Sequence, residues 1–520
     1  MEQVDHDHKS YVSSDRLSRL HCSNYVPNNV YDFVNWCVDS NAHRNCETCD
    51  EEPALKDNLR VIAICHDLIA QCRHIHTPIT LGLAILIHHQ FGSKSLINEL
   101  SAMGHCVSYT EVRQFLISVA ADQISRTESG VYIPTGLTGV TEHGIVDAAI
   151  DNFDQNEDTL DGKQTTHAMA SVVYRRGHVS TAYECLARVP ERSLSTLNTA
   201  DLNGEKLHRY IKPPKRPEPP ELPKPEILHI NTAVSKAAEG RDLVWKLSRN
   251  QSENQQHIPA WSAFNAFTSD TPCPVASVLY MPFIRESPSD LSTIYTAMIQ
   301  LVQLAEELGQ HHVLVTADLA IYSKAQQILW NKPELLKGKI TMRLGGMHIT
   351  MAYLASIGKL YGDGELFDIL TESDVYAEGT ARQLLQGKHK SNSYEMYSMH
   401  FMVMTRPLLN SLSGADLLLR ILRSEREADF QLHLNSMCEV IPWFRAAGIT
   451  NYAKYMPVYV AEMKALEHEQ PEAYTFMQEG GFVARRSEDH SFNCVATDQA
   501  LEKTINREGK SQGGVVGFTL

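Results

Sequence analysis

The sequence lacks the features that would assign it to a membrane or secreted class. Only 11 of its 520 residues are cysteine, too few for a scaffold held together by disulfides. The strongest apolar run, Ile79 to Ile87, is too short to cross a bilayer, and the first residues have no signal-peptide core. We therefore expect an intracellular protein with reduced thiols and no membrane partner.

Positive charge is also in short supply. The chain has 47 Lys and Arg against 62 Asp and Glu, a net charge of −15. A protein with this balance does not coat nucleic acid through bulk charge, so any DNA contact has to use local patches or metal ions. Apolar residues make up 43%, which is typical of a globular protein with a sizeable core. The length allows two to four domains.

Residues 1–60 are polar, and we expect a mobile leader. Within it, Cys46 and Cys49 form a CxxC pair, with Cys37 and His43 upstream. A zinc site needs four converging ligands. The sequence has no second pair of this kind, which favours free thiols over zinc.

Residues 61–130 predict helices. One helix should stop at Gly104, and Ser108 and Glu111 fit a capping box at the start of the next. Two helices joined in this way resemble a helix-turn-helix. The second helix carries more acid than base, so we favour a packed helical hairpin over a DNA-reading element.

Residues 140–350 predict an α/β core. Residues 144–151 predict a buried strand that ends at Asp151, and residues 166–174 a strand that returns after an acidic turn. Farther along, residues 275–350 alternate strand, helix, strand, helix and strand. One of these strands delivers Asp318 at its carboxyl end, where α/β sheets bind their ligands.

Two insertions interrupt this core. Residues 177–270 include the Pro-rich stretch PPKRPEPPELPKP, which predicts an extended spacer. Residues 351–480 predict a helical insertion. Residues 481–520 then return as a C-terminal helix region of the core, which carries Glu502.

These acids suggest one chemistry. Asp151 and Asp318 end two buried strands, and Glu502 lies on a predicted helix. A ribonuclease-H-like mixed sheet requires this arrangement, because its acids hold two Mg²⁺ ions that bridge the scissile phosphate. Asp154 is a further candidate ligand in the acidic turn. The other helical candidates for the third acid are Glu462 and Glu439.

Several scattered segments also match a known pattern. They are DNFD and TLDGK after residue 150 with His167, TADLAIYSKAQQILW around Asp318, RLGGMHI around His348, GKH at residues 387–389, NYAKYMP from Asn451, and DQALEKTIN with KSQGGVVGFT. In these segments the sequence resembles repetitive-element open reading frames of animal genomes that are associated with ribonuclease-H-like (DDE-type) transposases. The resemblance implies that Asp151 and Asp318 bind metal and that His348 lies near the metal or the DNA.

The resemblance has two departures. Residues 390–394 follow GKH without the basic run that the family leads us to expect, and the chain stops at Leu520, just past GGVVGFT. We therefore also consider a truncated or inactive copy.

Taken with the resemblance, the sequence predicts a transposon-derived DNA strand-transfer or nuclease-type protein. Its catalytic acids would be Asp151, Asp318 and Glu502, and its metal ligands Asp151, Asp154, Asp318 and His348. The expected cofactor is Mg²⁺ or Mn²⁺, and the expected partner is DNA at the element termini. Such a protein would be nuclear, and a homo-oligomer is compatible with this function.

The alternative is a noncatalytic, element-derived scaffold that keeps the fold and binds nucleic acid or protein. Its acids would have structural roles. Asp318 would then be the N-cap of the next helix, and His348 a hydrogen-bonded core or capping histidine.

Overall fold

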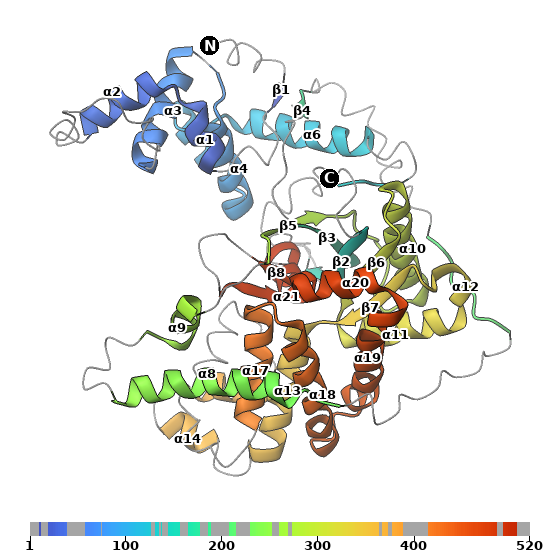
Figure 1. Ribbon diagram of the computed structural model, residues 1–520. Helices are drawn as coiled ribbons and strands as arrows, with labels where there is room; N and C mark the ends of the chain where they lie inside the picture. Colours follow the sequence, from blue (N-terminus) through green and yellow to red (C-terminus); the bar gives the residue numbers. More distant parts are fainter. Residues whose placement is uncertain are drawn as a thin grey trace. The chain divides into compact units, whose positions relative to one another are not determined.

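The computed structural model divides the chain into two compact units (Figure 1). One consists of Met1–Gly130, Ser180–Glu205 and Arg507–Leu520, the other of Val131–Val179 and Lys206–Asn506. The structure describes residues 10–11, 19–38, 58–73, 75–125, 131–134, 137, 144–156, 165–176, 186–188, 207–214, 229–251, 259–268, 273–362, 367–372, 377–387, 414–485 and 492–506. In these ranges, no helix is both long and apolar enough to cross a membrane.

The first unit is built from short helices. They are α1 (Arg19–Tyr25), α2 (Asn28–Val38), α3 (Leu59–Arg73), α4 (Pro78–Phe91), α5 (Lys94–Ala102) and α6 (Tyr109–Ser125), with a small sheet of β1 (Ser10–Tyr11) and β4 (Leu186–Ala187). The leader was expected to be mobile, but residues 19–25 and 28–38 are helical. The reason is apolar packing, since Val26 and Val34 lie in one buried cluster with Ile62 of α3.

The predicted helical hairpin has its expected ends. Helix α5 ends before Gly104, whose φ of 84° is readily adopted by glycine. The backbone N–H of Glu111 donates to Ser108 Oγ at 3.3 Å, as predicted for the start of α6. The Glu111 side chain pairs with Arg188 at 2.8 Å. Cys46 and Cys49 lie outside the described residues.

The second unit contains a five-stranded mixed sheet in the order β5-β3-β2-β6-β7. The strands are β2 (Ile145–Asn156), β3 (Thr165–Arg176), β5 (Ala276–Tyr280), β6 (His312–Ala317) and β7 (Ile340–Leu344). Strands β5, β3 and β2 pair antiparallel, whereas β2, β6 and β7 pair parallel. The fold is thus mixed α/β and mostly helical, as the alternation of strands and helices predicted.

The prediction that the first strand ends at Asp151 is wrong. The parallel pairing of β2 with β6 stops at Ile150, which lies opposite Ala317. The antiparallel pairing with β3 continues to Asn156. Asp151 therefore marks the place where the five-stranded sheet narrows to a two-stranded hairpin.

The two faces of this sheet differ in polarity. Helices α10 (Leu291–Glu307) and α11 (Leu319–Asn331) contact its strands and share an apolar core with Val146, Ala148 and Ile150 of β2. Side chains alternate along a strand, so Asp147 and Asp151 point to the other face. There α21 (Thr497–Leu501) packs against β2 and β6.

A block of helices extends beyond the polar face. It contains α13 (Gly346–Tyr361), α14 (Phe367–Glu372), α15 (Glu378–Leu385), α17 (Gly414–Arg426), α18 (Phe430–Ala446), α19 (Thr450–Glu469) and α20 (Pro471–Phe476). The chain returns to the sheet through η6 (Met477–Gly481) and the hairpin of β8 (Val483–Arg485) and β9 (Cys494–Ala496), and η7 (Glu502–Asn506) follows α21. The remaining helices are α8 (Thr232–Gln251), α9 (Trp261–Thr268) and α12 (Pro333–Leu336).

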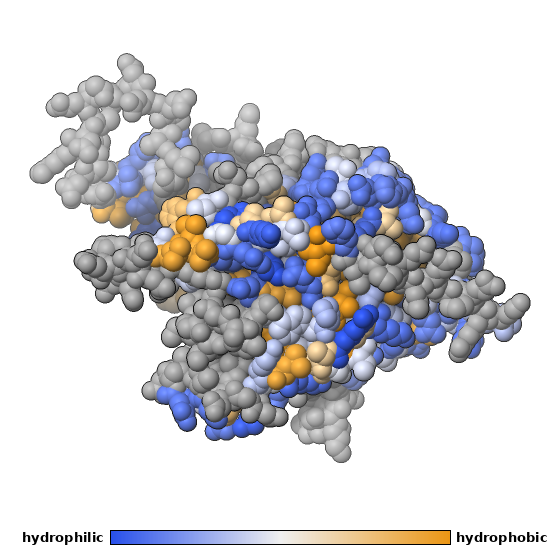
Figure 2. All heavy atoms as spheres, turned by 60° about the horizontal axis from the view of Figure 1, so that its bottom comes forward, coloured by the Kyte–Doolittle hydropathy of each residue, from blue (hydrophilic) through white to orange (hydrophobic). Residues whose placement is uncertain are grey.

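The predicted insertion, residues 177–270, contains the helix α8, which belongs to the block. Asp242 of α8 pairs with the fully buried Arg423 of α17 at 2.5 Å, which holds α8 in place. Along the outer side of α8, Leu243, Val244 and Leu247 are exposed. Figure 2 shows a surface on which apolar patches are separated by hydrophilic side chains.

Candidate functional site

Two acids lie side by side where the parallel strands end. Asp151 follows Ile150 on β2, and Asp318 follows Ala317 on β6, and those two preceding residues are opposite each other in the ladder. The Asp151 side chain is buried, whereas Asp318 is half-buried. Adjacent strands lie about 4.8 Å apart, so these two positions are neighbours at one end of the sheet.

Asp318 also caps the helix that follows. Its Oδ1 accepts the backbone N–H of Ile321 at 2.8 Å, as expected for an N-cap of α11. The structural role considered for Asp318 is therefore confirmed. It does not exclude a ligand role, because this hydrogen bond occupies one of the two carboxylate oxygens.

Another acid, Asp498 of α21, holds the start of α13. Its Oδ1 accepts the N–H of Met347 at 3.2 Å, and its Oδ2 accepts the N–H and Nδ1–H of His348 at 3.1 and 2.9 Å. This contact needs glycine at residue 345, since a Cβ there would overlap the Asp498 carboxylate. The contact joins the RLGGMHI and DQALEKTIN segments and fixes His348.

The charges of His348, Glu502 and Asp318 all act on the ionisation of Asp151, so these four residues form one site. Burial raises the pKa of Asp151 to about 8, the charges of Glu502 and Asp318 add to the rise, and the charge of His348 opposes it. Burial disfavours the charged form of His348, but Asp498, Asp151 and Asp318 outweigh it and raise its pKa to about 9. The cluster thus contains a cation and several acids that are costly to ionise together.

The remaining candidate acids lie elsewhere. Asp154 is three residues beyond Asp151, so it points to the opposite face of the hairpin, where it pairs with His167 at 2.6 Å. Glu462 accepts hydrogen bonds from Tyr322 and Gln326, and Glu439 pairs with Arg420. The structure brings Asp151, Asp318, His348 and Glu502 together, but not Asp154, Glu462 or Glu439.

A different charge cluster lies on the same polar face. Asp147 pairs with Arg343 at 2.6 Å and with Arg176 at 2.5 Å. Arg343 also donates to Thr316 at 2.7 Å, and Thr316 bonds Thr497 of α21 at 2.8 Å. These contacts tie β2, β3, β6, β7 and α21 together.

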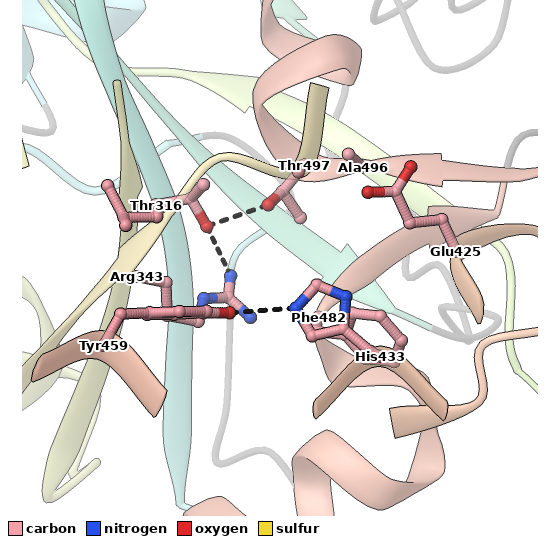
Figure 3. A pocket seen from close by; sticks show the side chains of 10 residues that line it. Thr316, Arg343, Glu425, His433, Tyr459, Phe482, Ala496 and Thr497 are labelled. Atoms are coloured by element: carbon pink, nitrogen blue, oxygen red, sulfur yellow. Dashed lines mark hydrogen bonds between the residues drawn. The ribbon is translucent and has the colours of Figure 1, made fainter. Parts of the chain in front are cut away.

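Beside this cluster is a small pocket lined by the sheet, α18, α19 and the start of α21 (Figure 3). Within it, His433 bonds the Tyr459 hydroxyl at 3.0 Å. Burial, together with the charge of Arg343, lowers the pKa of His433 to about 3. The pocket histidine is therefore neutral near pH 7, unlike His348.

Neither Asp498 nor Tyr452 was predicted from the sequence as a site residue. Asp498 precedes Glu502 by four residues, about one helical turn, so the same segment offered both acids. Tyr452, in the NYAKYMP segment, stacks on Phe444 with ring centroids 4.9 Å apart. Burial and the charges of Asp318 and Asp498 raise its pKa.

Carboxylate oxygens are the ligands that Mg²⁺ prefers, and the acids around Asp151 fit that chemistry. Among the residues with described side chains, no three His, Cys, Asp or Glu side chains already form a metal-binding group. Mg²⁺ is usually held by one or two carboxylates together with water and substrate phosphates. Asp151 and Asp318 are the two acids at these strand ends.

Comparison with known families gives one match. The model of a family described as a domain of unknown function (DUF8702) matches residues 260–416 and 409–520. The chain belongs to this family. No curated protein and no solved structure shows significant similarity to it.

Proposed function

We propose that the chain is a metal-dependent phosphoryl-transfer protein of the ribonuclease-H-like class that acts on DNA. The observation that carries the proposal is the pair Asp151 and Asp318 at adjacent strand ends, with the charge of Glu502 in η7 close enough to raise the pKa of Asp151. Functional groups of α/β sheets gather at such strand ends.

The order of the strands supports the ribonuclease-H-like class. A ribonuclease-H-like sheet begins with an antiparallel hairpin, whose first strand then pairs parallel with a strand reached through a helix. Here β2 and β3 form the hairpin, α10 leads to β6, and α11 leads to β7. The first acid lies on the central strand, the second follows β6, and a later helix supplies the third.

In this proposal Asp151 and Asp318 hold one or two Mg²⁺ or Mn²⁺ ions, with Glu502 as the third acid. The metal would supply Lewis-acid stabilisation of a phosphate. His348, held by Asp498, places a positive charge beside Asp151 and can donate to a phosphate oxygen. The Asp498 contacts keep that imidazole in one orientation.

DNA is the proposed substrate, and the nucleus the proposed location, because the resembling families act on the ends of DNA elements. With a net charge of −15, DNA contact has to use local basic patches or metal ions that neutralise the acids at the site. Self-association of the chain on DNA belongs to the same proposal.

The test compares two helix-capping aspartates. Asp318 and Asp290 both cap helices, α11 and α10, and asparagine retains the cap in either position. With Mg²⁺ or Mn²⁺ and DNA carrying the element termini, Asp318→Asn should reduce cleavage or joining by about a thousandfold, because the charge that holds the metal is lost. Asp290→Asn should retain full activity. Equal activity in wild type and Asp318→Asn would refute the proposal.

The noncatalytic scaffold is the second candidate. It is favoured by the hydrogen bonds that already give Asp318 and Asp498 structural roles. A scaffold would bind DNA or a protein partner equally well in wild type and Asp318→Asn, and neither form would cleave DNA in any divalent metal.

A further inference from the structure

The pocket beside the Asp147 cluster is small and mainly polar. Its polar lining side chains come from both strands and helices, and they are those of Thr316, Arg343, Glu425, His433, Tyr459 and Thr497. The space open to the centre of a water molecule is about 10 Å³, close to the smallest volume that holds one water. The size of the pocket therefore selects a ligand as small as water.

Two nitrogen atoms of the lining residues have no hydrogen-bond partner in the part of the chain that the structure describes. They are Nδ1 of His433 and Nε of Arg343, and the two residues are 3% and 2% exposed. The other ring nitrogen of His433 bonds the Tyr459 hydroxyl at 3.0 Å, so only half of the polar capacity of this imidazole is used. Buried polar atoms are almost always hydrogen-bonded to protein or to ordered water, and these two nitrogens thus indicate a bound polar partner.

The chemistry of the lining favours a neutral partner over an ion. A cation in the pocket would meet the guanidinium of Arg343, and an anion would meet the carboxylate of Glu425, because both side chains line it. The neutral imidazole of His433 carries its proton on either ring nitrogen, so Nδ1 is a donor in one tautomer and an acceptor in the other. Water can both donate and accept, and it therefore satisfies Nδ1 in either tautomer.

We propose that this pocket binds one internal water molecule, which bridges His433 Nδ1 of α18 to the polar side chains across the pocket. Figure 3 shows Thr497 and Glu425 on the side of the pocket opposite His433 and Tyr459. An internal water typically makes about three hydrogen bonds, and the hydroxyl of Thr497 and the carboxylate of Glu425 offer the further partners. This inference is independent of the proposed function, since it needs neither metal nor DNA.

The position of the pocket gives the water a structural role. Thr497 is the first residue of α21 and precedes Asp498, which holds the start of α13. Gly346 of α13 also lines the pocket, and a Cβ there would overlap the Glu425 carboxylate. The segments that make the Asp498 contact thus form part of the pocket wall. A water bound there would connect α18 to the beginning of α21.

The first test is a high-resolution crystal structure of the full-length protein, with a second crystal soaked in bromide. We expect one electron-density peak in the pocket, about 3 Å from His433 Nδ1, and no anomalous signal at that position after the soak. A pocket without density would overturn the proposal. An anomalous bromide peak would also overturn it, because the site would then bind an anion.

Two variants test the partner of the water in solution. Oxygen-17 magnetic relaxation dispersion counts the long-lived waters inside a folded protein. His433→Phe removes Nδ1, so we expect it to contain one long-lived water fewer than wild type. Tyr459→Phe is the matched control, because it removes the hydroxyl that bonds His433 Nε2 and leaves Nδ1 in place, and it should retain the water. An unchanged count in folded His433→Phe protein would contradict the assigned site.

Discussion

Two buried aspartates on strand β2 have opposite surroundings. Asp147 and Asp151 lie four residues apart on the same face of the strand, and their side chains are nearly inaccessible to solvent. Asp147 is paired with two guanidinium groups, those of Arg343 and Arg176. Asp151 instead faces the acids Asp318 and Glu502, with His348 as an opposing positive charge.

The difference separates an acid that stabilises the fold from one suited to a ligand. The arginines compensate the charge of Asp147 and connect the sheet to the segments around it. Ionising Asp151 among other acids is unfavourable in the absence of a ligand, and such perturbed acids gather at functional sites. A bound divalent cation would neutralise the charge of the ionised Asp151.

The largest loss of stability should come from breaking the ion pairs of Asp147 with Arg343 and Arg176. Asp147→Asn leaves two arginines without their carboxylate, Arg343 fully inside the protein and Arg176 half-buried. We expect the free energy of unfolding to fall by about 3–5 kcal/mol, measured by urea denaturation at pH 7. A loss below about 1 kcal/mol would remove the structural role that we assign to this cluster.

A smaller effect is expected where α21 meets α13. Gly345→Ala would place a Cβ against the Asp498 carboxylate and force α21 away from α13. We expect a loss of about 1–3 kcal/mol in urea denaturation. Gly240→Ala in α8 is the control: open space surrounds that position, so the variant should gain up to about 1 kcal/mol from helix propensity. Equal stabilities of the two variants would argue against the close contact.

The smallest change in stability should come from Asp151→Asn, which should stabilise the protein where the two preceding variants destabilise it. Burial raises the pKa of Asp151 from 3.8 to about 8, so its contribution to stability declines as the pH rises between these values. Against the effect of burial, the neighbouring acids raise the pKa of His348 from 6.5 to about 9, and its contribution to stability likewise declines between these values. Without divalent metal, Asp151→Asn should exceed wild type in stability at pH 9 by on the order of 1 kcal/mol.

Thermal unfolding of wild type and Asp151→Asn at pH 6 and pH 9 gives the comparison. The advantage of the variant should shrink at pH 6, where Asp151 is already protonated. An advantage that stays constant with pH would mean that Asp151 ionises without penalty.

Local patterns in the sequence predicted much of this sheet. The apolar run from His312 to Ala317 is a buried strand, and α10 begins after its N-cap Asp290 and ends at Glu307, shortly before Gly309 with its positive φ. These features depend on neighbouring residues alone, such as a capping carboxylate or a glycine with positive φ.

Features that depend on distant partners could not be predicted in this way. Strand β2 extends beyond Asp151 because its pairing with β3 continues to Asn156, whereas its pairing with β6 stops at Ile150. Asp147 is a core residue because Arg343, 196 positions later, lies opposite it. Asp498 became part of the site only when folding packed α21 against α13, although its spacing from Glu502 was a usable signal.

The most direct test of the central claim is metal binding itself. Mn²⁺ can be titrated into the purified full-length protein and its binding followed by electron paramagnetic resonance at pH 8. We expect wild type and Asp290→Asn to bind Mn²⁺, and Asp151→Asn and Asp318→Asn to lose that binding. Wild-type binding should weaken at pH 6, because a proton then competes for Asp151. Absence of binding in wild type, or equal binding in Asp318→Asn, would contradict a metal site between these two strands.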